Sequence, residues 1–288
     1  MPHALQELLA RLEPDRAVRE PQRWRERGEA LEQLDAALAV AAAAPAAQAA
    51  VVRARALQAE LAAVESEFCA GIRWAIRRGE RPPWLLEQVR DCAQGSASAP
   101  DCFDALDSMV ATILELDEPA APGMAAEREL VPYQPTPARH IFDFIAQAAP
   151  QADDVVVDLG SGLGHVPLLT AICTDATCVG IEREPAYAAC SERAAHALGL
   201  RNVRFHAQDV RAADLSAATL CYLFTPFTGT VMRGVLDALR AQANRRALRI
   251  ATFGPCTAVV AREPWLHAET ACDPRRPVLF RARPSATG

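Results

Sequence analysis

Residues 1–118 show the apolar spacing of helices. Apolar side chains recur there every three or four residues, as in the leucines between positions 5 and 12, and β-branched runs are few. A long pattern from Ala46 to Arg78 meets Gly79 and then Pro82, residue types that end helices. This part is predicted to be a helical bundle, and the Pro/Gly/Ala-rich segment 118–124 is typical of a linker.

After the linker the pattern changes to short apolar or β-branched runs that alternate with helical stretches. Such alternation predicts right-handed crossovers and a parallel sheet, and the last two runs predict an antiparallel hairpin. We therefore expect an all-α domain over residues 1–124 and a Rossmann-type α/β domain of seven strands over 125–288. The predicted strands are 155–160, 178–182, 202–207, 219–224 and 247–254, the hairpin is 264–271 with 276–283, and the helices are 139–149, 163–173, 185–198 and 229–243.

Composition narrows the class of protein. The 288 residues are 51% hydrophobic and 23% charged, which is typical of a soluble globular chain. The net charge of −6 makes nucleic acid an unlikely partner, although all 30 bases are arginine. Nine cysteines without a C-x-x-C pair indicate neither a metal site nor a dithiol site, and they fit reduced thiols in a cytoplasm. The N-terminus lacks the apolar core of a signal peptide, and the alanine-rich stretch 36–52 is broken by Pro45, so neither export nor a membrane span is expected.

A glycine-rich loop follows the first predicted strand. Asp158-Leu159-Gly160-Ser161-Gly162-Leu163-Gly164-His165 leads directly into a helix. Glycines let the chain turn tightly and let a ligand lie against bare backbone, in nicotinamide enzymes, flavoproteins and methyltransferases alike. In the dinucleotide fingerprint the third glycine falls where His165 stands, and an apolar residue usually occupies the place of Asp158. A carboxylate there suits a ligand with a cationic amine and no pyrophosphate.

The next two strand ends also carry polar residues. Glu182, followed by Arg183, ends the second strand, where a carboxylate can accept from both hydroxyls of a ribose. Gln208, Asp209 and Val210 follow the third strand, where an adenine edge would lie. Taken singly, each acid is as well explained as a loop residue or helix cap. Three successive strand ends in this order predict a nucleoside cofactor.

At these residues the chain resembles the class I S-adenosylmethionine-dependent methyltransferases over about 131–283. The segment Tyr133-Gln134-Pro135-Thr136-Pro137, upstream of the glycine loop, is similar to the Y-x-P-T-P segment of the non-SET protein-lysine methyltransferases related to the telomeric-silencing disruptor. The resemblance implies S-adenosyl-L-methionine as cofactor and S-adenosyl-L-homocysteine as product. It implies these roles: Tyr133 and Thr136 over the methionine part; Asp158, Gly160 and Gly162 at its amino-acid end, with Ser161 and His165 beside them; Glu182 and Arg183 at the ribose; Gln208, Asp209 and Val210 at the adenine.

The loop after the fourth strand is expected to face the methyl acceptor. It reads Phe224-Thr225-Pro226-Phe227, where amine-methylating nucleic-acid enzymes have D/N-P-P-Y/F, so Thr225 replaces the usual Asp or Asn. Tyr133, Thr225 and Phe227 are the catalytic candidates, and Phe224 and Thr225 are expected to contact the cofactor as well. An aromatic wall can attract a sulfonium, although Phe224 by itself is better explained as a core residue. No general base is assigned.

The sequence therefore predicts a methyltransferase whose leading acceptor is a lysine side chain of a protein, on resemblance. A small-molecule N- or O-methyltransferase, with the helical domain covering the pocket, is the alternative. A catalytically idle binding module remains open, and a nicotinamide dehydrogenase is disfavoured by Asp158 and His165. The sequence does not identify the oligomeric state or the role of the helical domain.

Overall fold

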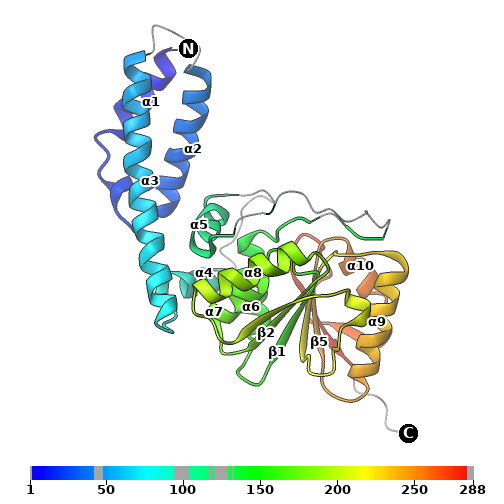
Figure 1. The fold of residues 1–288 in the computed structure, drawn as a ribbon. Helices are drawn as coiled ribbons and strands as arrows, with labels where there is room; N and C mark the ends of the chain where they lie inside the picture. Colours follow the sequence, from blue (N-terminus) through cyan, green and yellow to red (C-terminus); the bar gives the residue numbers. More distant parts are fainter. Residues whose placement is uncertain are drawn as a thin grey trace. The chain divides into compact units, whose positions relative to one another are not determined.

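A computed structural model describes residues 2–41, 48–93, 104–116, 119, 129–131 and 133–283 (Figure 1). Contacts divide the chain into two compact units. One comprises the described residues of Met1–Trp74 and Phe103–Ile113, and the other comprises those of Ala75–Cys102 and Leu114–Gly288. The boundary at residue 124 stays a prediction. The contacts group the described part of 75–102 with the sheet, because α4 (Pro83–Ala93) packs against α6 (Ala138–Ala148).

The first unit is helical, as its apolar spacing predicts. Its core is formed by the leucine stripe of the first helix, including Leu5 and Leu9, packed on Leu34 and Leu61. Its elements are α1 (Pro2–Leu12), η1 (Ala17–Arg19), α2 (Trp24–Ala41), most of α3 (Gln48–Arg77) and α5 (Ala105–Leu114). Gly79, at φ +74°, follows the end of α3, as the sequence predicts. No helix in the described part of the chain combines the length and apolar character needed to cross a bilayer.

The second unit contains a seven-stranded sheet in the order β3-β2-β1-β4-β5-β7-β6. Strands β1 to β5 are parallel, and β7 runs antiparallel to both β5 and β6. This confirms the expected fold, the sheet of class I methyltransferases. The strands are β1 (Val155–Leu159), β2 (Thr177–Glu182), β3 (Val203–Ala207), β4 (Leu220–Phe224), β5 (Arg249–Phe253), β6 (Leu266–Ala268) and β7 (Val278–Ala282); the intervening helices are α7 (His165–Cys173), α8 (Pro185–Ala197), η3 (Val210–Ala212), α9 (Gly229–Ala243) and α10 (Cys256–Val260).

Two details of the sheet differ from the sequence prediction. The first hairpin strand has only three residues, Leu266–Ala268, where 264–271 was expected. The segment after β5 forms the short helix α10, although no helix was predicted there. With Pro255 at its start and only five residues, α10 is too short for apolar periodicity to reveal it.

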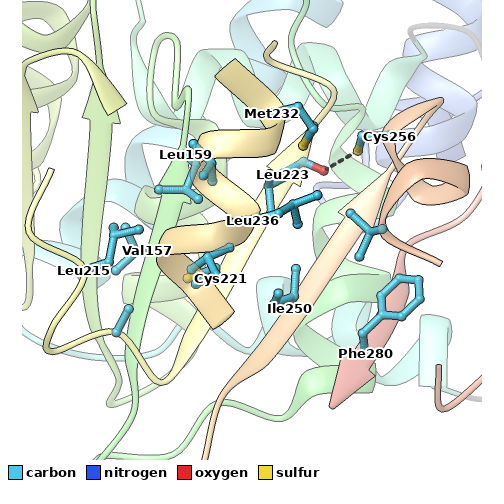
Figure 2. Close-up of a cluster of buried hydrophobic side chains, with 14 of the residues drawn as sticks. Val157, Leu159, Leu215, Cys221, Leu223, Met232, Leu236, Ile250, Cys256 and Phe280 are labelled. Carbon is cyan, nitrogen blue, oxygen red and sulfur yellow. Dashed lines mark hydrogen bonds between the residues drawn. The ribbon is translucent and has the colours of Figure 1, made fainter. Parts of the chain in front are cut away.

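Alternation along the strands decides which side chains approach the two faces of the sheet. Val157, Cys221 and Ile250 point toward α9 and form a buried apolar cluster with it (Figure 2). Asp158 and Tyr222, the next residues along β1 and β4, therefore point to the opposite face, and the Tyr222 ring lies 4.9 Å from that of Phe144 on α6. The polar groups of two central strands are thus placed together.

Candidate functional site

A cavity of about 610 Å³ opens at the carboxyl ends of the parallel strands. This is the edge at which open parallel sheets bind ligands. It is lined by the ends of β1, β2 and β4, by the described residues of 130–136, and by the loops after β3 and β4. The structure brings every predicted site residue to this cavity. They are Tyr133, Thr136, Asp158, Gly160, Ser161, Gly162, His165, Glu182, Arg183, Gln208, Asp209, Val210, Phe224, Thr225 and Phe227.

The glycine loop after β1 exposes bare backbone to the cavity. Gly160, Gly162 and Gly164 have φ angles of +90°, +52° and +81°, a left-handed region that other residues rarely adopt. The loop folds back onto β2, since the amides of Gly160 and Ser161 donate to the Ile181 carbonyl at 2.9 and 3.0 Å. Helix α7 begins directly after it. A Cβ at any of the three would also overlap a neighbouring side chain, so this loop conformation requires glycine at each position.

Tyr133 lies over this loop. Its ring occupies the place of a Cβ at Gly162, meets the Tyr187 ring edge-on at a centroid distance of 5.1 Å, and has its hydroxyl 3.5 Å from His165 Nδ1. Burial lowers the pKa of His165 to about 4, so the imidazole is neutral near pH 7 and its Nδ1 can accept a hydrogen bond. The segment that the sequence predicts as a cover is thus placed over the glycines.

Asp158 and Ser161 are buried polar residues at the start of the glycine loop. Burial raises the pKa of Asp158 well above its usual value, the nearby Glu182 charge raises it further, and no hydrogen bond or cation from the described residues opposes them. The Ser161 hydroxyl is buried and has no hydrogen-bond partner among the described residues. A buried carboxyl of this kind gains from a cationic ligand, which would favour its charged form.

Glu182 fastens the glycine loop to the start of α8. Its carboxylate accepts the Gly162 amide at 2.7 Å and the Glu184 amide at 2.8 Å. Burial raises the pKa of Glu182, and these amide hydrogen bonds oppose the rise. The Arg183 backbone also hydrogen-bonds this carboxylate, and three such bonds leave part of its acceptor capacity for a ligand hydroxyl.

Asp209 makes structural contacts within its own loop. Its carboxylate accepts the Arg211 amide at 2.9 Å, which caps η3, and it forms an ion pair with the Arg211 guanidinium at 2.5 Å. The Arg211 hydrogen bonds lower the pKa of Asp209 to about 2. The structure thus supports the cap explanation that the sequence left open for this residue, and its role toward an adenine stays a prediction.

The loop after β4 corrects two expectations. Phe227, not Phe224, is the core residue: it is 2% exposed and packs in the cluster under α9, whereas Phe224 is half-buried against Phe253 at a centroid distance of 4.6 Å. The Thr225 hydroxyl accepts the Cys256 amide at 3.0 Å and donates to the Phe253 carbonyl at 3.3 Å. That side chain is therefore bound by the β5–α10 turn, whereas an acceptor contact was expected of it.

Sequence reasoning missed Tyr222, which also lines the cavity. Its hydroxyl is fully buried and donates to Thr136 Oγ1 at 3.5 Å, and burial raises the pKa of this phenol. Tyr222 stands opposite Asp158 in the β1–β4 register. The available signal was a hydroxyl-bearing residue inside an otherwise apolar strand, two positions before its end.

Charge is unevenly distributed around the cavity. The acidic and basic lining residues lie on or just after β1, β2 and β3. They are Asp158, His165, Glu182, Arg183, Glu184 and Asp209. The described lining residues of 130–136, β4 with its following loop, and Pro255 carry no acidic or basic side chain. The charged side chains of the lining thus come from β1, β2 and the segments that follow β1, β2 and β3, whereas the described residues of 130–136 and the loop after β4 contribute apolar, aromatic, proline and uncharged polar side chains.

No protein-family model and no curated protein matches the sequence. Among solved structures, an RNA methyltransferase from Salinibacter ruber, in complex with S-adenosyl-L-homocysteine, is 23% identical, with a TM-score of 0.44 over 54% of this chain and 97% of that one. The putative methyltransferase yhhF from Escherichia coli is 14% identical, with a TM-score of 0.41 over 51% and 85%. TrmN from Thermus thermophilus is 17% identical, with a TM-score of 0.39 over 51% and 48%, so this chain spans about half of its length. These likenesses are too distant to assign a ligand or an acceptor.

Proposed function

We propose that this chain is an S-adenosyl-L-methionine-dependent methyltransferase, with S-adenosyl-L-homocysteine as product. The observation that carries the proposal is the arrangement of Asp158, Glu182 and Asp209 at three successive strand ends around one cavity, beside a glycine loop with bare backbone. The methionine ammonium fits the buried Asp158 carboxyl and the Ser161 hydroxyl, which has no hydrogen-bond partner among the described residues, because a cation offsets the cost of burying the carboxylate charge. Glu182 and Arg183 would hold the ribose, and Gln208, Asp209 and Val210 would surround the adenine.

The cofactor supplies an activated methyl group on a cationic sulfur. The chain's own contribution is alignment, since an in-line displacement needs the acceptor held close and in line. Tyr133 and Thr136 line the cavity together with Phe224 and Pro226, and the Val131 amide donates to the Pro226 carbonyl at 3.2 Å. An aromatic ring such as Phe224 or Tyr133 attracts a cation by about 0.5–2 kcal/mol.

The acceptor that we propose is a protein lysine, and the uncharged lining contributed by the described residues of 130–136 and the loop after β4 supports it. A lysine must lose its proton before its nitrogen can attack. The described residues of 130–136 and the loop after β4 bring no carboxylate to the cavity, and burial against such a lining disfavours the ammonium form and so lowers the pKa of an entering amine. This supplies neutral nucleophile without a dedicated base. A small-molecule acceptor of matching shape would meet the same lining and is the alternative.

The test is a transfer assay with methyl-labelled S-adenosyl-L-methionine in a lysate of the source organism, with protein, RNA and small molecules counted separately. Asp158→Ala is the inactive comparison, and Asp153→Ala, which removes an exposed carboxylate just before β1, is the matched control. We expect label in protein that depends on Asp158 and not on Asp153. Because this chain contains no lysine, methyl-lysine in the protein hydrolysate must come from another protein.

Each other outcome changes a specific part of the proposal. Label confined to small molecules would replace the lysine acceptor by the alternative, and label in RNA would contradict both. Absence of label from every fraction, together with absence of S-adenosyl-L-homocysteine binding in calorimetry, would overturn the methyltransferase proposal itself.

A further inference from the structure

Thr225 is held in a backbone conformation that its own side chain disfavours. Its φ of +39° lies in the left-handed region, where a β-branched residue is an outlier. Such strain persists only where surrounding contacts enforce it, and it gathers at functional sites. Here the strained residue directly follows β4, in a loop that lines the cavity and whose lining residues carry no acidic or basic side chain.

The contacts that enforce it come from the turn between β5 and α10. The Thr225 hydroxyl accepts from the Cys256 amide and donates to the Phe253 carbonyl, at 3.0 and 3.3 Å. The Cys256 thiol in turn lies 3.5 Å from the carbonyl oxygen of Leu223 on β4 (Figure 2). It also lies 3.3 Å from the carbonyl oxygen of Phe253. The ends of two adjacent strands are therefore linked through one partly buried hydroxyl and one buried thiol.

This cross-link determines where the neighbouring lining residues lie. Pro226 packs against Gly160 so closely that a Cβ on that glycine would overlap the proline ring. Phe224 packs on Phe253, and a Cβ on Gly254 would lie 3.1 Å from the Phe224 ring. Phe224 and Pro226 are thus the two chain neighbours of Thr225, whose hydroxyl bonds hold this part of the loop in place.

We infer that Thr225 is a positioning residue: its hydroxyl holds the Phe224–Pro226 loop in the strained conformation that shapes the acceptor end of the cavity. The inference rests on the proposed methyltransferase function. It deepens that function by giving Thr225 a role through Cys256 and Phe253, in place of direct contact with the acceptor. The strain is retained because the hydroxyl bonds offset it.

Three substitutions separate the hydroxyl from the strain. Thr225→Ser keeps the hydroxyl without the β-branch, Thr225→Val keeps the branch without the hydroxyl, and Thr225→Gly removes both. Thr219→Val is the matched control: the Thr219 hydroxyl accepts the Val155 amide at 2.9 Å and donates to Asp154 at 2.7 Å, at the other end of β4. That control loses a comparable strand-linking hydroxyl without touching the cavity.

The measurements are thermal unfolding, S-adenosyl-L-homocysteine affinity, and kcat and KM for the acceptor. We expect kcat/KM of Thr225→Ser to lie within about threefold of the wild-type value. In Thr225→Val and Thr225→Gly we expect kcat/KM to fall by about tenfold or more, because the loop is misplaced. Gly should nevertheless unfold at a higher temperature than Val, because it relieves the strain. Cofactor affinity should stay within about threefold throughout, and Thr219→Val should lose stability without losing kcat.

The inference would be overturned if kcat/KM followed thermal stability, so that Thr225→Gly was more active than Thr225→Val. It would also be overturned if Thr219→Val lost as much activity as Thr225→Val. So would full activity of Thr225→Val in a wild-type enzyme that transfers methyl groups. A wild type that neither binds the cofactor nor transfers overturns the proposed function instead. In that case the order of unfolding temperatures still tests the strain, and a Gly variant less stable than Val would refute it.

Discussion

The Tyr133 ring occupies the space that a side chain at position 162 would need. A Cβ built on Gly162 overlaps two ring carbons of Tyr133, and φ of Gly162 is +52°. The Tyr133 segment can therefore pack on the glycine loop only because residue 162 has no Cβ. This contact makes the glycine a requirement of the cover as well as of the turn.

Gly162→Ala should weaken cofactor binding. The alanine must adopt a left-handed conformation, at a cost of about 1–2 kcal/mol, and its methyl group must displace Tyr133. We expect the dissociation constant of S-adenosyl-L-homocysteine, measured by calorimetry, to rise about tenfold or more, which corresponds to at least 1.4 kcal/mol.

Gly234→Ala provides the control for that substitution. Gly234 lies within α9, and a Cβ there meets no atom within 4 Å. This variant should bind normally and gain about 0.5–1 kcal/mol in the free energy of unfolding, because alanine favours helices. Equal affinity in Gly162→Ala and wild type would show that Tyr133 does not cover the ligand.

Local pattern was enough to predict the strand ends and the cavity they surround. Asp158, Glu182 and Asp209 follow apolar runs, and parallel strands bring such positions to one edge whatever the details of packing. What sequence could not give depends on contacts between distant segments. The bond of Tyr222 to Thr136, the positive φ of Thr225 and the burial of Phe227 instead of Phe224 are set by which neighbours each side chain meets, and periodicity carries no record of that.

Glu129→Ala should loosen the attachment of the segment that leads to Tyr133 to the segment between β4 and α9. Glu129 joins the two: its carbonyl accepts the Thr228 amide at 2.7 Å, and its carboxylate accepts the Val231 amide at 3.1 Å and the Thr230 hydroxyl at 2.7 Å, at the start of α9. Alanine removes the side-chain bonds. We expect faster amide hydrogen exchange at 228–231 and a higher KM for the acceptor, with kcat less affected.

Glu129→Gln separates charge from hydrogen bonding at the same position. The amide oxygen can still accept from Val231, so most of the exchange protection should return, while the favourable charge at the helix start is lost. Exchange rates in Glu129→Ala equal to those of the wild type would show that the main-chain bond to Thr228 alone holds the loop.

Asp209→Asn should affect acid stability more than cofactor binding. The ion pair with Arg211 lowers the pKa of Asp209 to about 2, below the value of about 3.9 in an unfolded chain. Its contribution is therefore complete above about pH 4 and is lost as pH falls through about 2. Asparagine still caps η3, so the unfolding temperatures of variant and wild type should differ at pH 6 and converge near pH 2. An affinity loss of more than about tenfold would instead assign the carboxylate to direct adenine contact.

Asp158 has the opposite linkage. Burial and Glu182 raise its pKa, so the folded protein without ligand retains a proton that the unfolded chain releases above about pH 4. The stability that this proton gives is complete below about pH 4 and is lost as pH rises toward the raised pKa. A cationic ligand beside the carboxyl reverses this, since it favours the ionised form.

Asp158→Asn should therefore stabilise the ligand-free protein and weaken the cofactor. The amide removes the cost of a buried carboxylate, so the unfolding temperature at pH 7 to 8 should rise above that of the wild type. The same change removes a charge-assisted contact of about 1.5–3 kcal/mol, so cofactor affinity should fall by about tenfold to a hundredfold. Calorimetry of the wild type in buffers of different ionisation enthalpy should detect proton release on binding, absent in the variant. An Asp158→Asn protein that is less stable and binds equally well would mean that this carboxyl serves the fold and not the ligand.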